Sequence, residues 1–343
     1  MDVTSLQLRA QARVDDVTWG YFQGTADGDL DRDTRAWARW DFVPRVMTGM
    51  ASIDTSTRIG GALFSSPVVL APSASQGAMH PDGELATRRA AAAAGLLAGY
   101  SFHATVEVER FAAAADAPWW AQAYVLEERF ISDGYLRRCA AHGASAIILT
   151  VDVPGALADA PFRRVPMSPA VAHRGNYPVD ERGRAASVTT ASFLTPDDIR
   201  RTADVSGLPV WVKGIMTAQD AHRALDAGAA GVFVSNHARR QLAGVAPTAA
   251  VLSAVVEGLA GRAPVIVDGG IRSGADAVRA LALGAHAAAI GRPIPWALAA
   301  GGQTELEFLL STLTDEIRVT MAALGAARVG DVVSGMVQQA VVA

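Results

Sequence analysis

Short apolar runs separated by helical patterns recur along most of this chain. Between residues 209 and 293 the runs VWVK, GVFVS, VIVD and AAAI each end in polar residues or in glycine. Helical patterns such as AQDAHRALDAG and SGADAVRALALG lie between them. Most of the runs are continuously apolar, which is typical of parallel strands buried on both faces. The pattern therefore predicts alternating strands and helices.

Applied to the whole chain, this pattern predicts eight strands. Helices are expected between most of them, and several of these helices end at a glycine, where a left-handed residue commonly closes a helix. Eight strand–helix units predict an α/β protein folded as a (β/α)8 TIM barrel. The predicted strands are 68–71, 96–101, 119–124, 146–151, 210–213, 231–235, 265–268 and 287–290.

Three regions fall outside the strand–helix repeat. Residues 1–60 are expected to form a helical and irregular N-terminal cap, and residues 61–343 the barrel. Residues 155–192, after the fourth strand, are rich in Pro, Gly, Arg, Ala and Ser without a period, which predicts a lid or a disordered loop. Residues 305–337 have helical periodicity and are expected to pack on the barrel as a C-terminal helix.

Composition narrows the class of protein. The chain has 343 residues, half of them hydrophobic, with a net charge of −4. Basic residues are scattered, so no nucleic-acid partner is expected. The single cysteine, Cys139, excludes an intramolecular disulfide and a Cys-rich metal site, and we expect it to be buried. With no signal peptide and no apolar stretch near the ~20 residues of a membrane span, we expect a cytoplasmic protein without a metal.

Glycine and arginine follow the last two predicted strands. Asp268, Gly270 and Arg272 come after the seventh strand, and Gly291 and Arg292 after the eighth. Barrels commonly bind phosphate at this place, where glycine lets the backbone approach the anion. Ordinary turn chemistry is the alternative for each pair alone. Together the two pairs favour a phosphate site.

Further polar residues end the middle strands. His237, with Arg240 three residues later, follows the sixth strand. Histidine is the usual general base near neutral pH, and arginine can clamp a carboxylate. Lys213, at the end of the fifth strand, can stabilise an electron-rich ring. Asp152, after the fourth strand, can orient the imidazole and raise its pKa. A structural histidine, a structural salt bridge and a loop-capping role are the respective alternatives.

Gln122 and Tyr124 alternate at the end of the third predicted strand. One strand parity can point both side chains into the barrel mouth, where an amide and a phenol suit hydrogen bonding to a ligand. The alternative is that both face a covering helix.

Taken in order, these motifs resemble those of the FMN-dependent α-hydroxy acid oxidases and dehydrogenases, a family that includes glycolate oxidase, lactate oxidase and mandelate dehydrogenase. The similarity covers nearly the whole chain, and its most specific part is the segment SNHARRQ. The matching segments are WGYFQGTADGD, APSASQGAMHPDGE, AQAYV, LTVDVP, VKG, SNHARRQL, DGGIRSGAD and GRP.

The resemblance implies FMN as the cofactor and assigns its contacts residue by residue. The flavin ring would contact Pro72, Ser73 and Ala74, and its edge or the ribityl chain would contact Ser101, Gln122 and Thr150. The N1/C2 side of the ring would face Lys213 and Ser235. The ribityl and phosphate groups would contact Asp268, Gly270, Arg272, Gly291 and Arg292.

The resemblance also implies the reaction. His237 would be the catalytic base, Asp152 its partner and Arg240 the carboxylate clamp, while Tyr21 and Tyr124 would bind the substrate carboxylate or hydroxyl. A 2-hydroxy acid would be oxidised to a 2-keto acid, by a hydride or a carbanion route, with Lys213 stabilising the reduced ring. Oxygen, a quinone or a protein carrier would then accept the electrons. A homo-oligomer, often a tetramer, is a further implication.

Four departures from the family pattern lie on the substrate side. Ala238 and Arg239 stand where the family usually has glycine and then glycine or alanine, and Ala243 stands at a customary aspartate. No arginine occurs in GALADA, where a substrate-facing one is usual, so Arg163, Arg164 or Arg239 is expected to supply that charge. His103, also expected to face the substrate, occupies a customary aromatic position. These changes predict a larger or unusual substrate.

Three other functions stay open at this point. The same residues suit a flavin enzyme acting on an amino acid or a biosynthetic intermediate, because the His237–Arg240 pair requires a carboxylate but not a hydroxyl. The altered HARR segment would also suit a flavin-binding protein without turnover. A phosphate-binding isomerase or aldolase barrel would share only the glycine–arginine sites.

Overall fold

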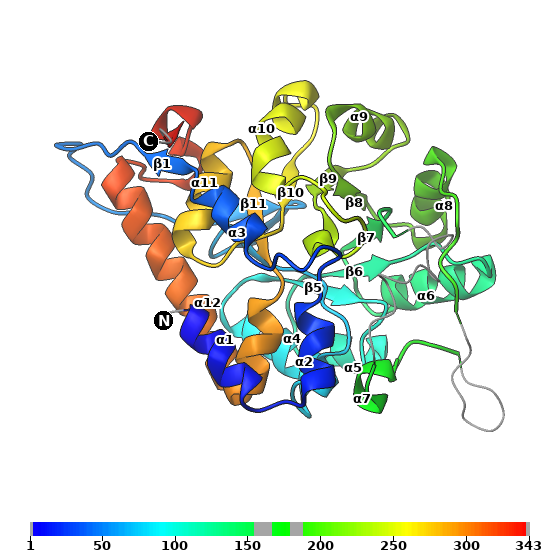
Figure 1. Ribbon diagram of the computed structural model, residues 1–343. Helices are drawn as coiled ribbons and strands as arrows, with labels where there is room; N and C mark the ends of the chain where they lie inside the picture. Colours follow the sequence, from blue (N-terminus) through cyan, green and yellow to red (C-terminus); the bar gives the residue numbers. More distant parts are fainter. Residues whose placement is uncertain (1–2, 154–166, 179–187, 341–343) are drawn as a thin grey trace.

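The computed structural model describes residues 3–153, 167–178 and 188–340. Its centre is a closed barrel of eight parallel strands, which Figure 1 shows ringed by helices. The barrel confirms the predicted TIM-barrel fold. Around it the strands follow the chain, and the last pairs with the first: β4 (Val68–Leu70), β5 (Leu97–Ser101), β6 (Trp119–Ala123), β7 (Ala146–Thr150), β8 (Val210–Ile215), β9 (Gly231–Val234), β10 (Val265–Val267) and β11 (Ala287–Ile290).

The observed strands match the predicted ones to within two residues at each end. The largest difference is in β8, which continues beyond Lys213 to Ile215 with an irregularity in its pairing to β9. Gly214 lies at this irregularity with φ of 110°. A Cβ at this glycine would lie 2.6 Å from the Cβ of Asp152, so the close approach of the two strand ends requires a residue without a side chain.

The helices that cover the barrel begin and end where the sequence signals them. In α8 (Pro196–Ser206) and α11 (Gly274–Ala282) a threonine or serine and an aspartate form reciprocal caps at the first turn. The glycines expected to close four of the helices all have positive φ: Gly95, Gly143, Gly228 and Gly284. The other covering helices are α4 (Gly83–Ala93), α5 (Val108–Ala113), α6 (Arg129–Ala141), α9 (Ala218–Asp226), α10 (Thr248–Leu259) and α12 (Pro293–Leu324).

The N-terminal segment reaches both ends of the barrel. Helix α1 (Val3–Gln11) packs along α12, as Figure 1 shows in blue and orange. Helices α2 (Asp16–Gln23) and α3 (Arg32–Trp37) follow, and the Trp37 indole donates to the carbonyl of Gly269 at 2.7 Å. The hairpin of β2 (Thr57–Ile59) and β3 (Ala62–Phe64) crosses the expected boundary at residue 60 and packs against the apolar floor of the barrel.

The C-terminal prediction was partly wrong. Helix α12 starts earlier than expected, bends at Gly301 and Gly302, and ends at Leu324, where Gly325 adopts φ of 75°. The chain beyond forms turns and β12 (Val337–Gln339), which pairs with β1 (Trp40–Phe42). A glycine in the left-handed region stops a helix, so the later apolar residues contribute to packing without extending it.

Two layers of apolar side chains form the core. One fills the barrel, with Trp120 and Trp211 4.7 Å apart between ring centroids, and the other lies between barrel and helices. Cys139 belongs to the outer layer and is buried, as expected. None of the helices described has the length and apolar character needed to cross a membrane.

Most of the predicted lid lies outside the described residues. Its described part contains the short helix α7 (Pro169–Ala172), which lies beside α2 (Figure 1). The Thr18 and Ser168 hydroxyl oxygens are 3.0 Å apart, and Ser75 donates to the carbonyl of Val171 at 2.9 Å. This part of the loop therefore sits next to the barrel mouth.

Candidate active site

A cavity opens at the carboxyl ends of the barrel strands. Nearly every side chain singled out in the sequence lines it: Tyr21, Pro72, Ser73, Ala74, Ser101, His103, Gln122, Tyr124, Thr150, Lys213, His237, Arg240, Asp268, Gly270, Arg272, Gly291 and Arg292. Asp152 and Ser235 are not among the lining residues. Each lies one contact behind the wall, against His237 and Lys213 respectively.

One end of the cavity is rich in partly buried positive charge. Burial lowers the pKa of Arg272 to about 10 and that of Arg292 to about 9. Neither guanidinium forms a salt bridge within the described residues; Arg292 reaches only the carbonyls of Gln23, Gly24 and Ala238, at 3.3–3.4 Å. Partly buried cations without a paired counter-ion are unfavourable, so this end is built to receive an anion.

Two glycines allow the backbone itself to line the cavity at the end that holds these arginines. Gly269 and Gly270 have φ of 92° and 79°. A Cβ on Gly270 would collide with the backbone of Asp33, so the barrel end and the N-terminal segment approach as closely as glycine permits.

Lys213 forms the structural salt bridge considered for it and also faces the cavity. Its Nζ lies 2.6 Å from the Ser235 hydroxyl and 3.0 Å from Oδ2 of Asp268, so it forms a salt bridge and also lines the cavity. The other carboxylate oxygen of Asp268 is buried without a partner in the described residues. Lysine and aspartate thus present a charge and a free acceptor at the cavity wall.

Hydroxyl and amide groups form the wall between β5 and β7. The Gln122 amide donates to the Thr150 hydroxyl at 3.0 Å, and its oxygen accepts from the backbone N–H of Phe102 at 3.2 Å. The Ser101 hydroxyl lies 3.4 Å from the same oxygen. The alternative that Gln122 faces a covering helix is wrong.

His237 and Asp152 meet at the opposite side. Nδ1 of His237 lies 3.0 Å from Oδ1 of Asp152. Burial raises the pKa of Asp152, but the charge and hydrogen bond of His237, with Lys213, outweigh it and leave that pKa below its ordinary value. An ionised aspartate only accepts, so Nδ1 carries a proton. In the neutral imidazole Nε2 is then free to act as a base.

Arg240 lies beside this pair without a carboxylate partner in the described chain. Its Nη2 donates to the carbonyls of Tyr21 at 2.6 Å and Phe22 at 2.8 Å, and the guanidinium carbon is 5.4 Å from the Tyr21 ring centre. Burial lowers the pKa of Arg240. A base, a phenol and an unpaired guanidinium therefore share one part of the cavity.

Aromatic rings form the outer wall next to Arg240. His103 packs against Tyr124 with ring centres 4.8 Å apart, and its Nδ1 lies 2.9 Å from the Tyr177 hydroxyl. Burial lowers the pKa of His103 to about 3, so this imidazole is neutral at physiological pH. Tyr177 belongs to the loop after β7, and no motif in the sequence identifies it.

The HARR segment departs from expectation in the direction of its first arginine, Arg239. Arg239 is buried and pairs with Asp27 on the side away from the cavity, so the expectation that it supplies the missing substrate-facing charge is wrong. Arg163 and Arg164 lie outside the described residues. Ala243 stands at the customary aspartate position, and the neighbouring Gly244 N–H donates to the Asp27 carboxylate at 3.3 Å.

The backbone of this segment is left-handed at three successive positions. His237, Ala238 and Arg239 have φ of 53°, 53° and 59°. Each such residue other than glycine costs roughly 1–2 kcal/mol. Surrounding contacts must therefore hold the loop.

Some cavity residues escaped the sequence reasoning. Phe22, from α2, lies within the matching segment WGYFQGTADGD but carries no polar group that would single it out, and Pro295, from α12, lies outside every matching segment. Ala238, Gly269 and Ile271 flank residues that were identified, so their place follows from the neighbouring motifs.

Comparison with known proteins identifies the family to which this cavity belongs. Residues 10–339 match the family model described as FMN-dependent dehydrogenase. The chain belongs to this family. A peroxisomal (S)-2-hydroxy-acid oxidase of Oryza sativa subsp. japonica is 36% identical over 97% of the chain and 94% of its own length. The corresponding Arabidopsis thaliana protein is also 36% identical, over the same shares.

Solved structures agree with the family assignment. A mandelate oxidase crystallised with (S)-4-hydroxymandelic acid has a TM-score of 0.88 at 31% identity, over 99% of both chains. A Pediococcus acidilactici protein called lactate oxidase also has a TM-score of 0.88, at 32% identity, over 100% of this chain and 95% of that one. The protein is thus an FMN-dependent oxidoreductase that acts on CH–OH groups of 2-hydroxy acids.

The residues present fit FMN. Two unpaired guanidiniums at glycine turns suit its phosphate. The unpartnered atoms Asp268 Oδ1 and Arg292 Nε suit the hydroxyl and phosphate groups of its chain. The Gln122, Ser101 and Thr150 groups, with Lys213, offer the donors and acceptors that an isoalloxazine edge needs.

Proposed function

We propose that this enzyme oxidises a 2-hydroxy acid larger than glycolate or lactate to the 2-keto acid, with His237 as base and Arg240 as carboxylate clamp. The observation that carries the proposal is the His237–Asp152 pair, 3.0 Å apart, in the same cavity as the unpaired Arg240. A base beside a buried cation suits a substrate whose reacting carbon is next to a carboxylate.

Each side chain then has a definite part in the reaction. Arg240 binds the substrate carboxylate, and Tyr21 and Tyr124 bind its carboxylate or hydroxyl. Nε2 of His237 accepts a proton from the substrate, and ionised Asp152 stabilises the imidazolium that results. FMN, when bound, would take up the two electrons and the second proton that the substrate loses. Lys213 places a positive charge on the side of the ring that becomes electron-rich.

The outer wall supports the larger substrate. His103 and Tyr124 line the cavity with a neutral imidazole and a phenol ring, and Tyr177 packs against His103. These rings suit an aromatic or extended apolar substituent better than a methyl group or hydrogen. The similar mandelate oxidase was crystallised with an aromatic acid. We propose oxygen as the electron acceptor because the curated relatives are named oxidases. A cytoplasmic location and a homo-oligomer stay predictions.

Anaerobic reduction tests the proposal. The purified protein with FMN is mixed with (S)-mandelate, (S)-lactate or glycolate, and bleaching of the oxidised flavin band is followed. We expect fastest bleaching with mandelate and almost none in His237→Asn. A clear preference for glycolate and lactate would overturn the larger substrate. A band that light reduces but no hydroxy acid does would overturn the reaction itself.

Discrimination between acceptors needs a second measurement. Once reduced by substrate, the enzyme is mixed with oxygen or with a quinone, and the return of the oxidised band is timed. Fast return with oxygen is expected; fast return with the quinone alone would exclude the oxidase assignment.

A further inference from the structure

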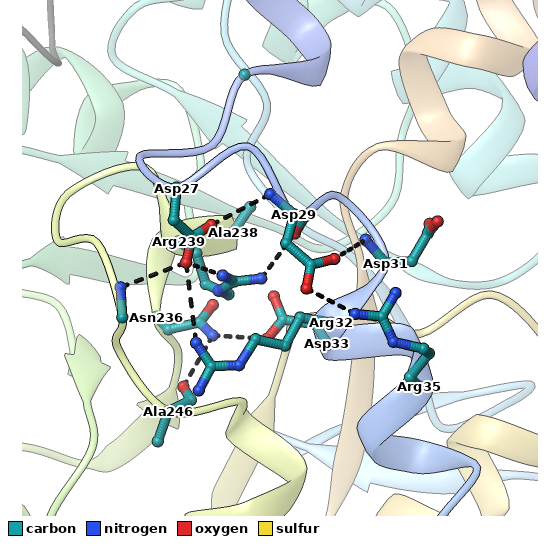
Figure 2. A network of polar contacts seen from close by, with 12 residues as sticks. Asp27, Asp29, Asp31, Arg32, Asp33, Arg35, Asn236, Ala238, Arg239 and Ala246 are labelled. Carbon is teal, nitrogen blue, oxygen red and sulfur yellow. Dashed lines mark hydrogen bonds and ion pairs between the residues drawn. The ribbon is translucent and has the colours of Figure 1, made fainter.

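The side chain of Arg239 points away from the cavity, unlike those of the nearby residues His237 and Arg240. His237 and Arg240 line the cavity, whereas the Arg239 side chain is 1% exposed and reaches the segment between α2 and α3 (Figure 2). A fully buried guanidinium requires partners. Those partners come from a segment more than two hundred residues earlier in the chain.

Asp27 and Asp29 supply the partners. The Arg239 guanidinium forms an ion pair with the Asp27 carboxylate and donates to the Asp29 carbonyl at 2.7 Å. The Ala26 N–H donates to the Arg239 carbonyl at 2.8 Å. The same Asp27 carboxylate accepts from the Gly244 N–H at 3.3 Å, so it holds the loop at two places (Figure 2).

A second contact anchors the residue just before His237. The Asn236 amide donates to the Asp33 carboxylate at 2.9 Å and to the Ala246 carbonyl at 3.2 Å. The loop that carries His237 and Arg240 is thus tied to residues 26–33 at both of its ends and in its middle. It has no comparable link to its own strand beyond the His237 N–H to Ser235, at 3.2 Å, within the described residues.

This attachment explains how three left-handed residues persist in succession. Neither alanine nor arginine favours that conformation, so a free loop would relax toward right-handed backbone. Relaxation would rotate His237 and Arg240 away from their shared cavity. The Arg239 pair opposes it because leaving would strand a buried charge.

We propose that Arg239, held by Asp27, is a positioning residue that fixes the loop of His237 and Arg240 in its working conformation. This inference rests on the proposed function for the roles of those two residues. The segment of residues 26–33 is, on this reading, a structural part of the active site.

Four variants test the role. In Arg239→Ala the ion pair is lost and the left-handed strain stays, so kcat/KM should fall about a hundredfold, as for a misplacement near 1 Å. Asp27→Asn should lose a similar factor, and the double variant no more than either alone, because the two act as one unit. Arg239→Gly should lose less than Arg239→Ala, because glycine accepts positive φ. Arg239→Lys should be intermediate.

A matched control lies in the same segment. Arg35 pairs with Asp29 at 2.6 Å on the surface and does not touch the loop, so Arg35→Ala should leave kcat/KM unchanged. Equal activity of Arg239→Ala and wild type would overturn the positioning role. So would an Arg239→Gly variant worse than Arg239→Ala, which would indicate a bulk-packing role.

Hydrogen exchange of the protein without FMN provides a readout independent of turnover. Amides of residues 236–246 should exchange faster in Arg239→Ala and Asp27→Asn, and at the wild-type rate in Arg35→Ala. Exchange at the wild-type rate in both Arg239→Ala and Asp27→Asn would overturn the proposal. If no 2-hydroxy acid reduced the wild-type enzyme, the proposed function would fail. The exchange test would still decide whether the Arg239–Asp27 pair holds the loop. Should Arg239→Ala not fold, the nearly isosteric Asp27→Asn decides both measurements.

Discussion

The two ends of the barrel interior are made from the same strands and differ in every other respect. Along β6 the floor residue Trp120 is followed two positions later by Gln122 at the mouth, and along β8 Trp211 is followed by Lys213. The floor is apolar and packs against the β2–β3 hairpin. The mouth carries unpaired cations and a strained loop. One strand can therefore place stability at its start and chemistry at its end.

The two ends of the barrel also differ in the contacts that the N-terminal residues make with them. At the floor, the hairpin adds apolar contact that only needs to fill space. At the mouth, residues 21–33 supply carbonyls and carboxylates that bind Arg240, Arg239 and Asn236. The N-terminal segment is therefore a covering element at one end of the barrel and a partner of the active-site loop at the other.

Removing the proposed base should give the largest effect and leave the floor untouched. His237→Asn lacks a group that can accept the substrate proton, so the rate of flavin reduction should fall by about 10²–10⁴-fold. Thermal unfolding should be nearly that of wild type. Rapid-mixing absorbance under anaerobic conditions measures the first and circular dichroism the second. A variant that reduced at the wild-type rate would exclude His237 as the base.

The reverse experiment breaks the floor and spares the mouth. Trp120 is buried against Trp211, so Trp120→Ala should lower the free energy of unfolding by about 3–5 kcal/mol. Per folded molecule, substrate reduction of FMN should be little changed at low temperature. Denaturant titration alongside the reduction assay measures both. Loss of activity without loss of stability would mean that the two ends are not independent.

The cationic end of the mouth should determine cofactor affinity. We expect Arg292 to hold the FMN phosphate through a charge-assisted contact, so Arg292→Met should weaken FMN binding by about 1.5–3 kcal/mol. Quenching of flavin fluorescence in a titration measures the change. Arg262→Met, at an exposed pair with Asp226, is the control and should bind FMN like wild type. Equal affinity of the two variants would move the phosphate away from Arg292.

The smallest effect concerns the neutral imidazole in the wall. The pKa of His103 is lowered to about 3, from 6.5, so the unfolded chain binds a proton that the folded chain does not between these values. This residue therefore lowers stability as pH falls from 6.5, by up to about 1.4 kcal/mol per pH unit. His103→Gln should show a shallower loss of stability between pH 6.5 and 4.5. Melting temperatures at several pH values, with His142→Gln at the surface as the control, check this.

Much of the candidate site could be predicted from the sequence, and the reason is physical. Strand ends in a parallel barrel converge at one rim, so Lys213, His237 and Asp268 had to lie together once the strands were recognised. The Asp152–His237 contact followed from the same rule. The direction of Arg239 did not, because rim proximity says nothing about which way a side chain in an irregular turn points.

The sequence by itself determined the barrel, the family and most of the residues that line the mouth. Continuously apolar strands and left-handed glycines leave a local signal, and the motifs at their ends carry the chemistry. Only the tertiary structure decided that Arg239 pairs with Asp27, that Tyr177 meets His103, that Phe22 and Pro295 line the cavity and that α12 stops at Leu324. These contacts depend on how segments outside the strand–helix repeat pack against it. Such packing has no period in the sequence, because its energy comes from partners far along the chain.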